Sequence, residues 1–386
     1  MGLLRGVMTP LTGLLYNCRF EKFSKEGQYL ILFNHQTPLD QFIVSAVFPG
    51  SIYYVATEDI FSNGIISSLL RHAVAPIPIK KATTDISAVR NCLRVAKEGG
   101  TIAIAPEGNR TYSGKTGYIN PAIASLAKKM KLPIALMRIE GGYGVEPRWA
   151  SNIRRGKMKA YVSEVLTPEQ YADMSADEIY EFIKNGLFVD ESRIPGEYKS
   201  SKNAESIERA MFVCPDCGLS TFSSEGSVAW CNTCQKKISY GNDKKLKGIG
   251  FEFPYKYVGE WYEGQCGFVN RLDLLKFVKK PLFTDCADLS EVIVYKKKQP
   301  VKRAAVIRLY GDRITVMENS EAPMEFDFKD ITAVTAMGRN KLNINLHEKI
   351  YQFKGDKSFN PLKYVNFYYR FNNIAGGNGN AEFLGL

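Results

Sequence analysis

The polar stretch at 34–40, Asn-His-Gln-Thr-Pro-Leu-Asp, places an imidazole five residues before a carboxylate. A carboxylate behind a histidine ring fixes the tautomer of the ring and stabilises its protonated form. His35, held in this way by Asp40, is a general base able to remove a proton from a hydroxyl group. Within one regular helix this spacing would put the two side chains about 140° apart. We therefore expect His35 in a loop and Asp40 in the first turn of a helix.

The residues around this pair predict the local structure that would position it. The apolar run 29–33 is typical of a buried strand, and 34–36 is typical of a turn. Thr37 is a good N-cap and Pro38 suits the first helical position, which would put Asp40 at N3. The same residues also fit an ordinary capping box, and a histidine before a helix is often only a turn residue. The motif alone leaves a catalytic and a structural interpretation open.

A second polar loop follows another apolar run, at 101–105. It presents Glu107 and Arg110 on either side of Gly108. Glycine permits close approach of the backbone to a ligand, and the planar guanidinium of arginine suits a phosphate group. The alternative interpretation is a surface turn with a solvated glutamate and a solvated arginine.

Together the two stretches resemble the motifs of a known family, the glycerolipid acyltransferases typified by 1-acylglycerol-3-phosphate O-acyltransferase. The sequence NHQTPLD is similar to their NHx4D motif, and APEGNRT at 105–111 is similar to their FPEGTRS motif. APIPIKK at 75–81 and LPI at 132–134 resemble two further blocks, and all four occur in the family's order. The resemblance covers about residues 1–190, half of the chain.

The resemblance implies O-acyl transfer with a substrate hydroxyl group as the nucleophile. His35 would remove the acceptor proton as the oxygen attacks the carbonyl of a thioester, with Asp40 as its partner. No acyl-enzyme intermediate and no catalytic cofactor is then required. The donor would be acyl-CoA or acyl-carrier protein. The acceptor would be a lysophospholipid such as 1-acylglycerol-3-phosphate, in phospholipid biosynthesis.

The resemblance also implies a substrate-binding role for residues outside the catalytic pair. Glu107 and Gly108 would help to place the acceptor, and Arg110 would hold an acceptor phosphate. Lys81 stands where the family usually has arginine. It keeps the positive charge but lacks the bidentate fork. Asn109 replaces the usual threonine or serine of the second motif.

Alternation of predicted strands and helices places both motifs in one α/β domain, over residues 1–191. The expected architecture is a layered mixed sheet flanked by helices, with both motifs after strands, where open α/β sheets place their sites. His72 falls in the second expected helix and is interpreted as structural. Strands are expected at 51–56, 77–79, 133–139 and 157–165, and helices at 64–74, 86–97, 121–130 and 176–190.

Four of the eight cysteines form two Cys-x-x-Cys pairs separated by thirteen residues: Cys214, Cys217, Cys231 and Cys234. Each pair can direct two thiolates at one tetrahedral ion, and four thiolates leave no open position for catalysis. This pattern predicts a structural Zn²⁺ in a small ribbon at 211–245 and favours a reducing compartment. A redox-active pair is the less favoured alternative. The polar residues 192–210 are interpreted as a linker.

From residue 246 to 386 the pattern changes to short strands, followed by an aromatic-rich helix at 361–371. Successive hairpins closed by one C-terminal helix resemble a pleckstrin-like or GRAM-like domain, so this part is expected to be mainly β. The basic block YKKKQPVKR at 295–303 would then face anionic lipid. Lysines that protect an ordinary strand edge are the alternative.

Charge and the N-terminal segment bear on location and partners. The net charge of +11 favours an anionic partner, either a phospholipid surface or nucleic acid. The apolar segment 1–18 is interrupted by Pro10 and too short to span a bilayer, and it suits an interfacial helix or a core-packing helix equally. Without a convincing signal-peptide cleavage site, we expect a peripheral protein on the cytoplasmic face of the membrane.

A second function class stays open at this point. A catalytically inactive acyltransferase-like adaptor could bind nucleic acid or anionic lipid through its basic zinc-ribbon half. The ribbon carries little charge, with Lys236 and Lys237 as its cluster. Nucleic acid is therefore the less expected partner.

Overall fold

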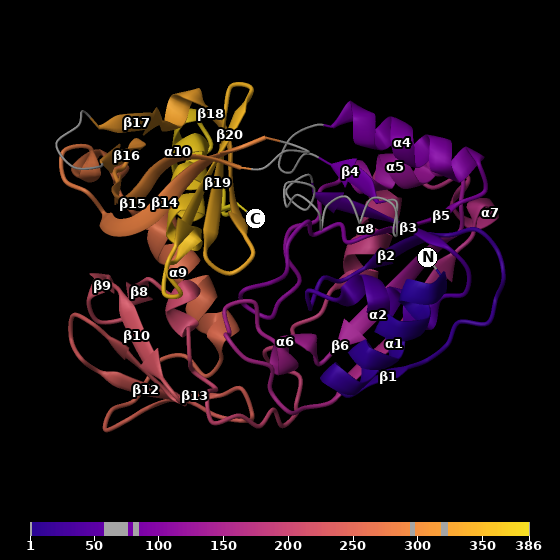
Figure 1. The fold of residues 1–386 in the computed structure, drawn as a ribbon, viewed down its shortest axis with the longest axis horizontal. Coiled ribbons are helices and arrows are strands. Elements are labelled where there is room, and N and C mark those ends of the chain that lie inside the picture. Colours follow the sequence, from indigo (N-terminus) through magenta and orange to yellow (C-terminus); the bar gives the residue numbers. More distant parts are fainter. Residues whose placement is uncertain (1, 58–75, 80–84, 294–297, 318–322, 386) are drawn as a thin grey trace. The chain divides into compact units, whose positions relative to one another are not determined.

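The structure is a computed structural model that describes residues 2–57, 76–79, 85–293, 298–317 and 323–385 (Figure 1). The expected helix at 64–74, with His72, lies outside the described residues, as do Lys81, Lys296 and Lys297. The chain forms two compact units. Unit 1 comprises Met1–Arg148, Asn152–Ser200 and Asn242–Lys244, and unit 2 comprises Trp149–Ser151, Ser201–Gly241 and Lys245–Leu386.

Unit 1 contains a seven-stranded sheet in the order β1-β7-β6-β2-β5-β3-β4. All neighbouring strands are parallel except β6 and β7, which are antiparallel. The predicted mixed α/β sheet is therefore confirmed. Its strands are β1 (Cys18–Phe20), β2 (Leu30–Phe33), β3 (Ile52–Thr57), β4 (Ile77–Ile79), β5 (Thr101–Ile104), β6 (Ile134–Glu140) and β7 (Met158–Leu166).

Two hydrophobic cores lie on opposite faces of this sheet, because alternate residues of β2 point to opposite sides. Leu30 and Leu32 belong to a core shared with α4, α5 and α8, whereas Ile31 and Phe33 belong to a core shared with α1 and α2. All four β2 residues are buried, which explains the unbroken apolar run. The helices are α1 (Gly2–Tyr16), α2 (Asp40–Val47), α4 (Ile86–Lys97), α5 (Ala122–Met130), α6 (Gly142–Val145), α7 (Pro168–Tyr171) and α8 (Ala176–Leu187).

The first part of unit 2 is a cysteine-rich ribbon. The hairpin β8 (Val213–Cys214) and β9 (Gly218–Leu219) precedes a four-stranded antiparallel sheet. The expected linker at 192–210 is not an exposed connection, because Ala204, Ile207 and Arg209 are buried. Polar side chains of this stretch are buried together with its apolar ones, among them Asn203 and Ser206. The ribbon sheet contains β10 (Phe222–Glu225), β11 (Val228–Cys231), β12 (Lys237–Tyr240) and β13 (Leu246–Gly248).

The second part of unit 2 is mainly β, as predicted. Its seven antiparallel strands have the order β17-β16-β15-β14-β20-β19-β18, and α10 (Pro361–Ala375) packs against β18. Successive hairpins followed by one helix are the arrangement expected of a pleckstrin-like domain. α9 (Val258–Arg271) precedes the sheet. The strands are β14 (Phe283–Val292), β15 (Gln299–Leu309), β16 (Arg313–Met317), β17 (Met324–Asp327), β18 (Ile331–Met337), β19 (Lys341–Leu346) and β20 (Lys349–Gly355).

Candidate active site

The two sequence motifs lie at the same edge of the sheet in unit 1, because the strands before them are parallel neighbours. β2 pairs with β5 in a register that sets Leu32 beside Ile104. Each strand ends within one residue of that pair, so the loops that follow leave the sheet together. The backbone N–H of His35 donates to Oε1 of Glu107 at 2.9 Å. The motifs are thus joined directly, across 72 residues of sequence.

The His35 and Asp40 side chains are in direct contact. Nδ1 of His35 lies 2.7 Å from Oδ2 of Asp40. A carboxylate accepts hydrogen bonds but does not donate them, so we assign the ring proton to Nδ1. Nε2 is then unprotonated and can accept a proton. The His35 side chain is 29% exposed whereas that of Asp40 is 1% exposed, so the ring alone can meet a substrate.

The Asp40 carboxylate also organises the backbone of the loop. It accepts hydrogen bonds from the backbone N–H of Gln36 at 2.7 Å and from that of Thr37 at 2.9 Å. The Thr37 hydroxyl donates to the same carboxylate at 2.7 Å. Asp40 therefore fixes the loop and the imidazole together, so the ring orientation is set before any substrate binds.

The predicted start of α2 was wrong. The helix begins at Asp40, and Leu39 occupies the N-cap position without a side-chain cap. Thr37 was expected as the N-cap and Pro38 as the first helical residue. The Asp40 carboxylate reaches back to the N–H groups before the helix, and the Thr37 hydroxyl donates to that carboxylate. The capping interactions are therefore used to hold the loop rather than to start a helix.

Glu107 is a buried link between the motif loops. Its side chain is 1% exposed, and its second oxygen accepts the backbone N–H of Gly117 at 2.7 Å. Burial raises the pKa of this carboxyl to about 7, although the N–H bonds from Gly117 and His35 oppose the rise. These contacts are with backbone, so the carboxylate positions His35, which differs from the expected contact with an acceptor. Nothing in the sequence identified Gly117.

The other predicted substrate-binding residues are placed only in part. Gly108 is exposed and has a φ of 67°, in the left-handed region that favours glycine. The carbonyl of Arg110 accepts a hydrogen bond from the Arg148 guanidinium at 2.9 Å. That guanidinium lies 4.2 Å from the centroid of the Tyr112 ring. Lys81 falls outside the described residues.

Asn34 and Gln36 attach the His35 loop to the neighbouring strand and helix. The Asn34 side chain donates to the carbonyl of Ile139 at 2.8 Å and accepts its N–H at 2.7 Å. Oε1 of Gln36 accepts the backbone N–H of Tyr143 at 3.1 Å. A Cβ atom on Gly142 would lie 2.5 Å from Cβ of Gln36, so only glycine fits there. These supports could not be predicted from the sequence, because they depend on contacts between residues distant in sequence.

α1 has one buried and one exposed face. The buried Tyr16 hydroxyl donates to Oε2 of Glu146 at 2.6 Å, and burial and that carboxylate raise the pKa of Tyr16 well above its usual value. The opposite face is apolar yet exposed. The segment that was expected to be an interfacial or a core-packing helix is a helix with one packed face and one exposed apolar face. The exposed side chains are Val7, Leu11, Leu14 and Leu15.

An open cavity of about 510 Å³ lies beside the C-terminal end of α1. Its lining combines apolar and basic side chains of unit 1. The apolar part contains Leu14, Leu15 and Ile153, and the basic part includes Arg155, Lys157 and Lys199. No helix within the described residues has both the length and the apolar character needed to cross a bilayer.

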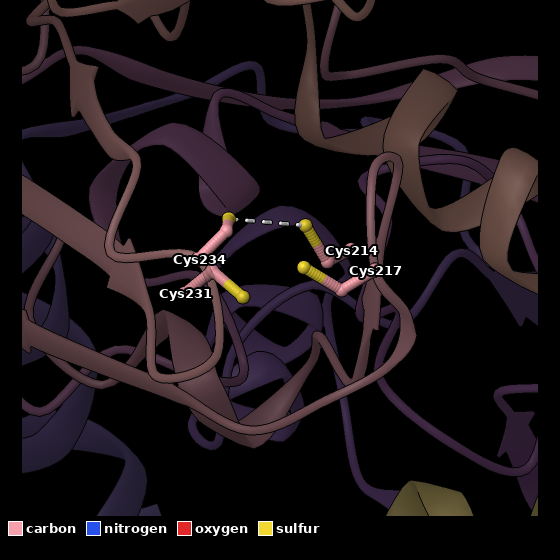
Figure 2. A group of neighbouring side chains, drawn as sticks. All are labelled: Cys214, Cys217, Cys231 and Cys234. Atoms are coloured by element: carbon pink, nitrogen blue, oxygen red, sulfur yellow. Dashed lines mark hydrogen bonds between the residues drawn. The ribbon is translucent and has the colours of Figure 1, made fainter.

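The four cysteines of the ribbon converge on one point, from the β8–β9 hairpin and from the end of β11 (Figure 2). All their sulfur atoms lie within 4.8 Å of one another, and all are free thiols. The Sγ atoms of Cys214 and Cys234 are 3.9 Å apart. Zn–S bonds of about 2.3 Å in a tetrahedron require sulfur separations of about 3.8 Å. This geometry fits a Cys₄ metal site.

The comparisons with known proteins concern the part of the chain that holds the active-site motifs. Residues 16–140 match the sequence model of the family described as Acyltransferase. Over 162 residues the chain is 25% identical to 1-acyl-sn-glycerol-3-phosphate acyltransferase of Bacillus subtilis (strain 168), covering 41% of this chain and 76% of that protein. Over 148 residues it is 22% identical to chloroplastic 1-acyl-sn-glycerol-3-phosphate acyltransferase BAT2 of Brassica napus, covering 38% of this chain and 42% of that one.

A solved structure is also similar. The crystal structure of the 1-acyl-sn-glycerophosphate acyltransferase PlsC from Thermotoga maritima superimposes with a TM-score of 0.39 and 20% sequence identity. The superposition covers 46% of this chain and 73% of that chain.

Proposed function

We propose that the chain is a glycerolipid acyltransferase, because residues 16–140 match the Acyltransferase family, and that it transfers a fatty acyl group from a thioester to the hydroxyl group of a lysophospholipid. One observation supports this proposal most directly. The part-exposed His35 ring lies 2.7 Å from the buried Asp40 carboxylate, and both residues fall inside the family match. Such a pair can deprotonate a hydroxyl group at neutral pH.

In the proposed reaction Nε2 of His35 takes the acceptor proton while the acceptor oxygen attacks the thioester carbonyl. The Asp40 carboxylate stabilises the imidazolium that forms. The carbon–sulfur bond then breaks, and the departing thiolate recovers the proton from Nε2. The products are the acylated lipid and the free thiol of the carrier. The carrier would be coenzyme A or acyl-carrier protein.

A phosphate group on the acceptor would give Arg110 and Lys81 their role. The relatives from Bacillus subtilis and Brassica napus carry names that specify 1-acyl-sn-glycerol-3-phosphate. We propose that this chain accepts the same class of lipid. A guanidinium at Arg110 can bind such a phosphate in a bidentate manner, and Lys81 can add a second charge.

We propose that α1 attaches unit 1 to the cytoplasmic face of an anionic membrane. Val7, Leu11, Leu14 and Leu15 follow a spacing of four, three and one residues, which places them on one face of a helix. An exposed apolar face beside basic side chains suits the boundary between headgroups and acyl chains. The Arg155 and Lys157 side chains of the neighbouring cavity lining would meet anionic headgroups, whereas Lys199 pairs with Glu197 at 3.3 Å.

The basic block at 295–303 remains a second proposed contact with anionic lipid. Lys298, Lys302 and Arg303 are the members that the structure describes. Nζ of Lys298 donates to the Gln352 side chain at 2.7 Å. In the ribbon Lys236 pairs with Asp216 at 3.0 Å, which reduces the charge available for nucleic acid. This pairing makes nucleic acid the less favoured partner of the ribbon.

For the Cys₄ site we propose a structural Zn²⁺ bound by Cys214, Cys217, Cys231 and Cys234. The four thiolates would complete a tetrahedral shell, so the ion would stabilise the ribbon and take no part in acyl transfer. The Ser220 hydroxyl lies 3.1 Å from Sγ of Cys231, where it can donate a hydrogen bond to a ligating thiolate.

The acceptor class can be tested with matched lipids. We expect purified protein to acylate a 1-acylglycerol-3-phosphate more efficiently than the 1-acylglycerol that lacks the phosphate. In the variant Arg110→Gln the KM for the phosphate-bearing lipid should rise, while turnover of the neutral lipid changes little. Equal kcat/KM for both lipids in the wild-type protein would contradict phosphate recognition.

A further inference from the structure

We propose that Lys244, far outside the family match, is a positioning residue for the active site. This inference rests on the proposed function. Lys244 belongs to the short segment Asn242–Lys244 that is part of unit 1, between strands β12 and β13 of the ribbon. The chain thus returns to the catalytic unit after the cysteine pairs.

The Lys244 side chain is buried and fully engaged. It is 1% exposed, and its ammonium group donates to the carbonyls of Glu191 and Ile194, the latter at 2.7 Å. Its Nζ also lies 5.0 Å from the centroid of the Tyr198 ring. A buried lysine is rare unless its charge is compensated. These contacts fix the chain segment that holds Glu191.

The backbone of the segment Asn242–Lys244 also supports a positioning role for Lys244. Lys244 has a φ of 66°, a conformation that glycine or asparagine adopts more easily. The carbonyl of Asn242 accepts a hydrogen bond from the backbone N–H of Tyr198 at 2.8 Å. This second contact attaches Asn242–Lys244 to the rest of unit 1.

Glu191 connects Lys244 to two parts of the active site, the chain after Glu107 and the start of α6. Its backbone N–H donates to the carbonyl of Gly114 at 2.8 Å, in the chain between Glu107 and its partner Gly117. Its carboxylate accepts the backbone N–H of Gly141 at 2.8 Å and 2.9 Å. Glu191 is completely buried, so these contacts are shielded from water.

The connection continues from Gly141 to the catalytic loop. Gly141 is the N-cap of α6, whose residue Tyr143 donates its backbone N–H to Gln36. Gln36 in turn donates its own N–H to Asp40, next to His35. The contacts from Glu191 to Gly141, from Tyr143 to Gln36 and from Gln36 to Asp40 are hydrogen bonds between buried groups, and Gly141 and Tyr143 are joined by the backbone of α6. A shift of the segment held by Lys244 would therefore move the loop that carries His35.

The test uses Lys244→Met, which keeps the length of the side chain but removes its hydrogen-bond donors. Turnover is measured on detergent-solubilised substrate, together with the ring resonances of His35 in histidine-labelled protein. The chain has only three histidines, so these signals can be assigned with His35→Gln. A matched control is Lys363→Met, because Lys363 is also buried, in unit 2, and bound to Asp285 at 2.7 Å.

We expect Lys244→Met to lower kcat roughly 10- to 100-fold, the usual range for a displaced catalytic group. The KM for the acceptor should change little, and the His35 ring signals should shift. Lys363→Met should lower thermal stability while kcat and the His35 signals stay unchanged. Folded Lys244→Met protein with wild-type kcat and wild-type His35 signals would overturn the proposal.

The Lys244→Met variant could fail to fold, and the wild-type protein could lack transfer activity. If Lys244→Met does not fold, Lys244→Gln, which keeps two N–H donors on a shorter chain, is measured with the same readouts and judged in the same way. If the wild-type protein transfers no acyl group, the proposed function fails, but the His35 signals still decide the role of Lys244. The role of Lys244 is supported if the His35 signals shift in the Lys244 variant but not in the Lys363 control. It is rejected if the His35 signals do not shift in the Lys244 variant.

Discussion

The substitution Asp40→Asn probes the most connected group of the active site. The Asp40 carboxylate accepts hydrogen bonds from His35 and Gln36 at Oδ2, and two from Thr37 at Oδ1. An asparagine has one acceptor oxygen and one donor NH₂ group. In either orientation the NH₂ group faces a backbone N–H, that of Gln36 or that of Thr37. One buried N–H therefore loses its acceptor, which costs about 1–3 kcal/mol of stability.

The catalytic effect of Asp40→Asn depends on which oxygen the NH₂ group replaces. If it replaces Oδ2, it donates to Nδ1 of His35 and moves the ring proton to Nε2, so the base is lost. If it replaces Oδ1, the tautomer survives but the imidazolium loses a neighbouring negative charge. A wrong tautomer costs about 10⁴-fold in kcat in a comparable His–Asp pair, or about 5 kcal/mol of barrier. We predict a loss between roughly 10²- and 10⁴-fold.

The assay for Asp40→Asn is the steady-state turnover of folded protein, with thermal unfolding measured in parallel. Asp85→Asn is a matched control, because Asp85 caps α4 by accepting the N–H of Ala88 at 3.1 Å and lies outside the active-site loops. Asparagine caps helices as well as aspartate does, so kcat should not change in this variant. A lowered melting temperature with wild-type kcat in Asp40→Asn would refute the catalytic role and leave Asp40 as a loop anchor.

Three further predictions concern stability, metal and membrane. The folded pKa of Glu107 is raised from 4.5 to about 7, so the native state binds more protons than the unfolded state between these values. The free energy of unfolding should therefore fall by about 3 kcal/mol as pH rises through this range. Glu107→Gln should remove that dependence in urea titrations, and the same pH dependence in wild type and variant would argue against a raised pKa of Glu107. Elemental analysis should find one Zn²⁺ per chain, and removal of the ion by a chelator should unfold the ribbon. The double variant Cys214→Ser Cys231→Ser should bind no Zn²⁺. Metal-free wild-type protein with free thiols would reject the site. The double variant Leu11→Glu Leu14→Glu should bind anionic vesicles at least tenfold more weakly, since each leucine buried in the membrane contributes about 2 kcal/mol. Its turnover in detergent should not change. Equal vesicle binding by the variant and the wild type would remove α1 from the proposed membrane contact.

The sequence predicts features that depend on local patterns. The apolar runs of β2 and β5, each followed by a polar loop, led to the sheet edge where the motifs meet. The two Cys-x-x-Cys pairs led to the ribbon, because their spacing alone brings four thiols together. The contact between His35 and Asp40 also follows from a short stretch of chain.

Features that depend on distant contacts could not be predicted. The carboxylate of Glu107 binds Gly117 and His35 through backbone N–H groups, which have no signature in the sequence. The stretch 192–210 was expected to be a linker because its composition is polar, yet both apolar and polar residues of it are buried.

Product formation by the purified chain tests the central proposal most directly. Protein is incubated with acyl-CoA or acyl-carrier protein and 1-acylglycerol-3-phosphate, and the diacylated product is quantified by mass spectrometry. We predict product from the wild-type protein and a loss of about 10²- to 10⁴-fold in His35→Ala. His347→Asn should match the wild type, because His347 is exposed in the turn between β19 and β20 and asparagine tolerates its φ of 53°. Wild-type turnover in folded His35→Ala, or no product from folded wild-type protein with either donor, would contradict the proposal.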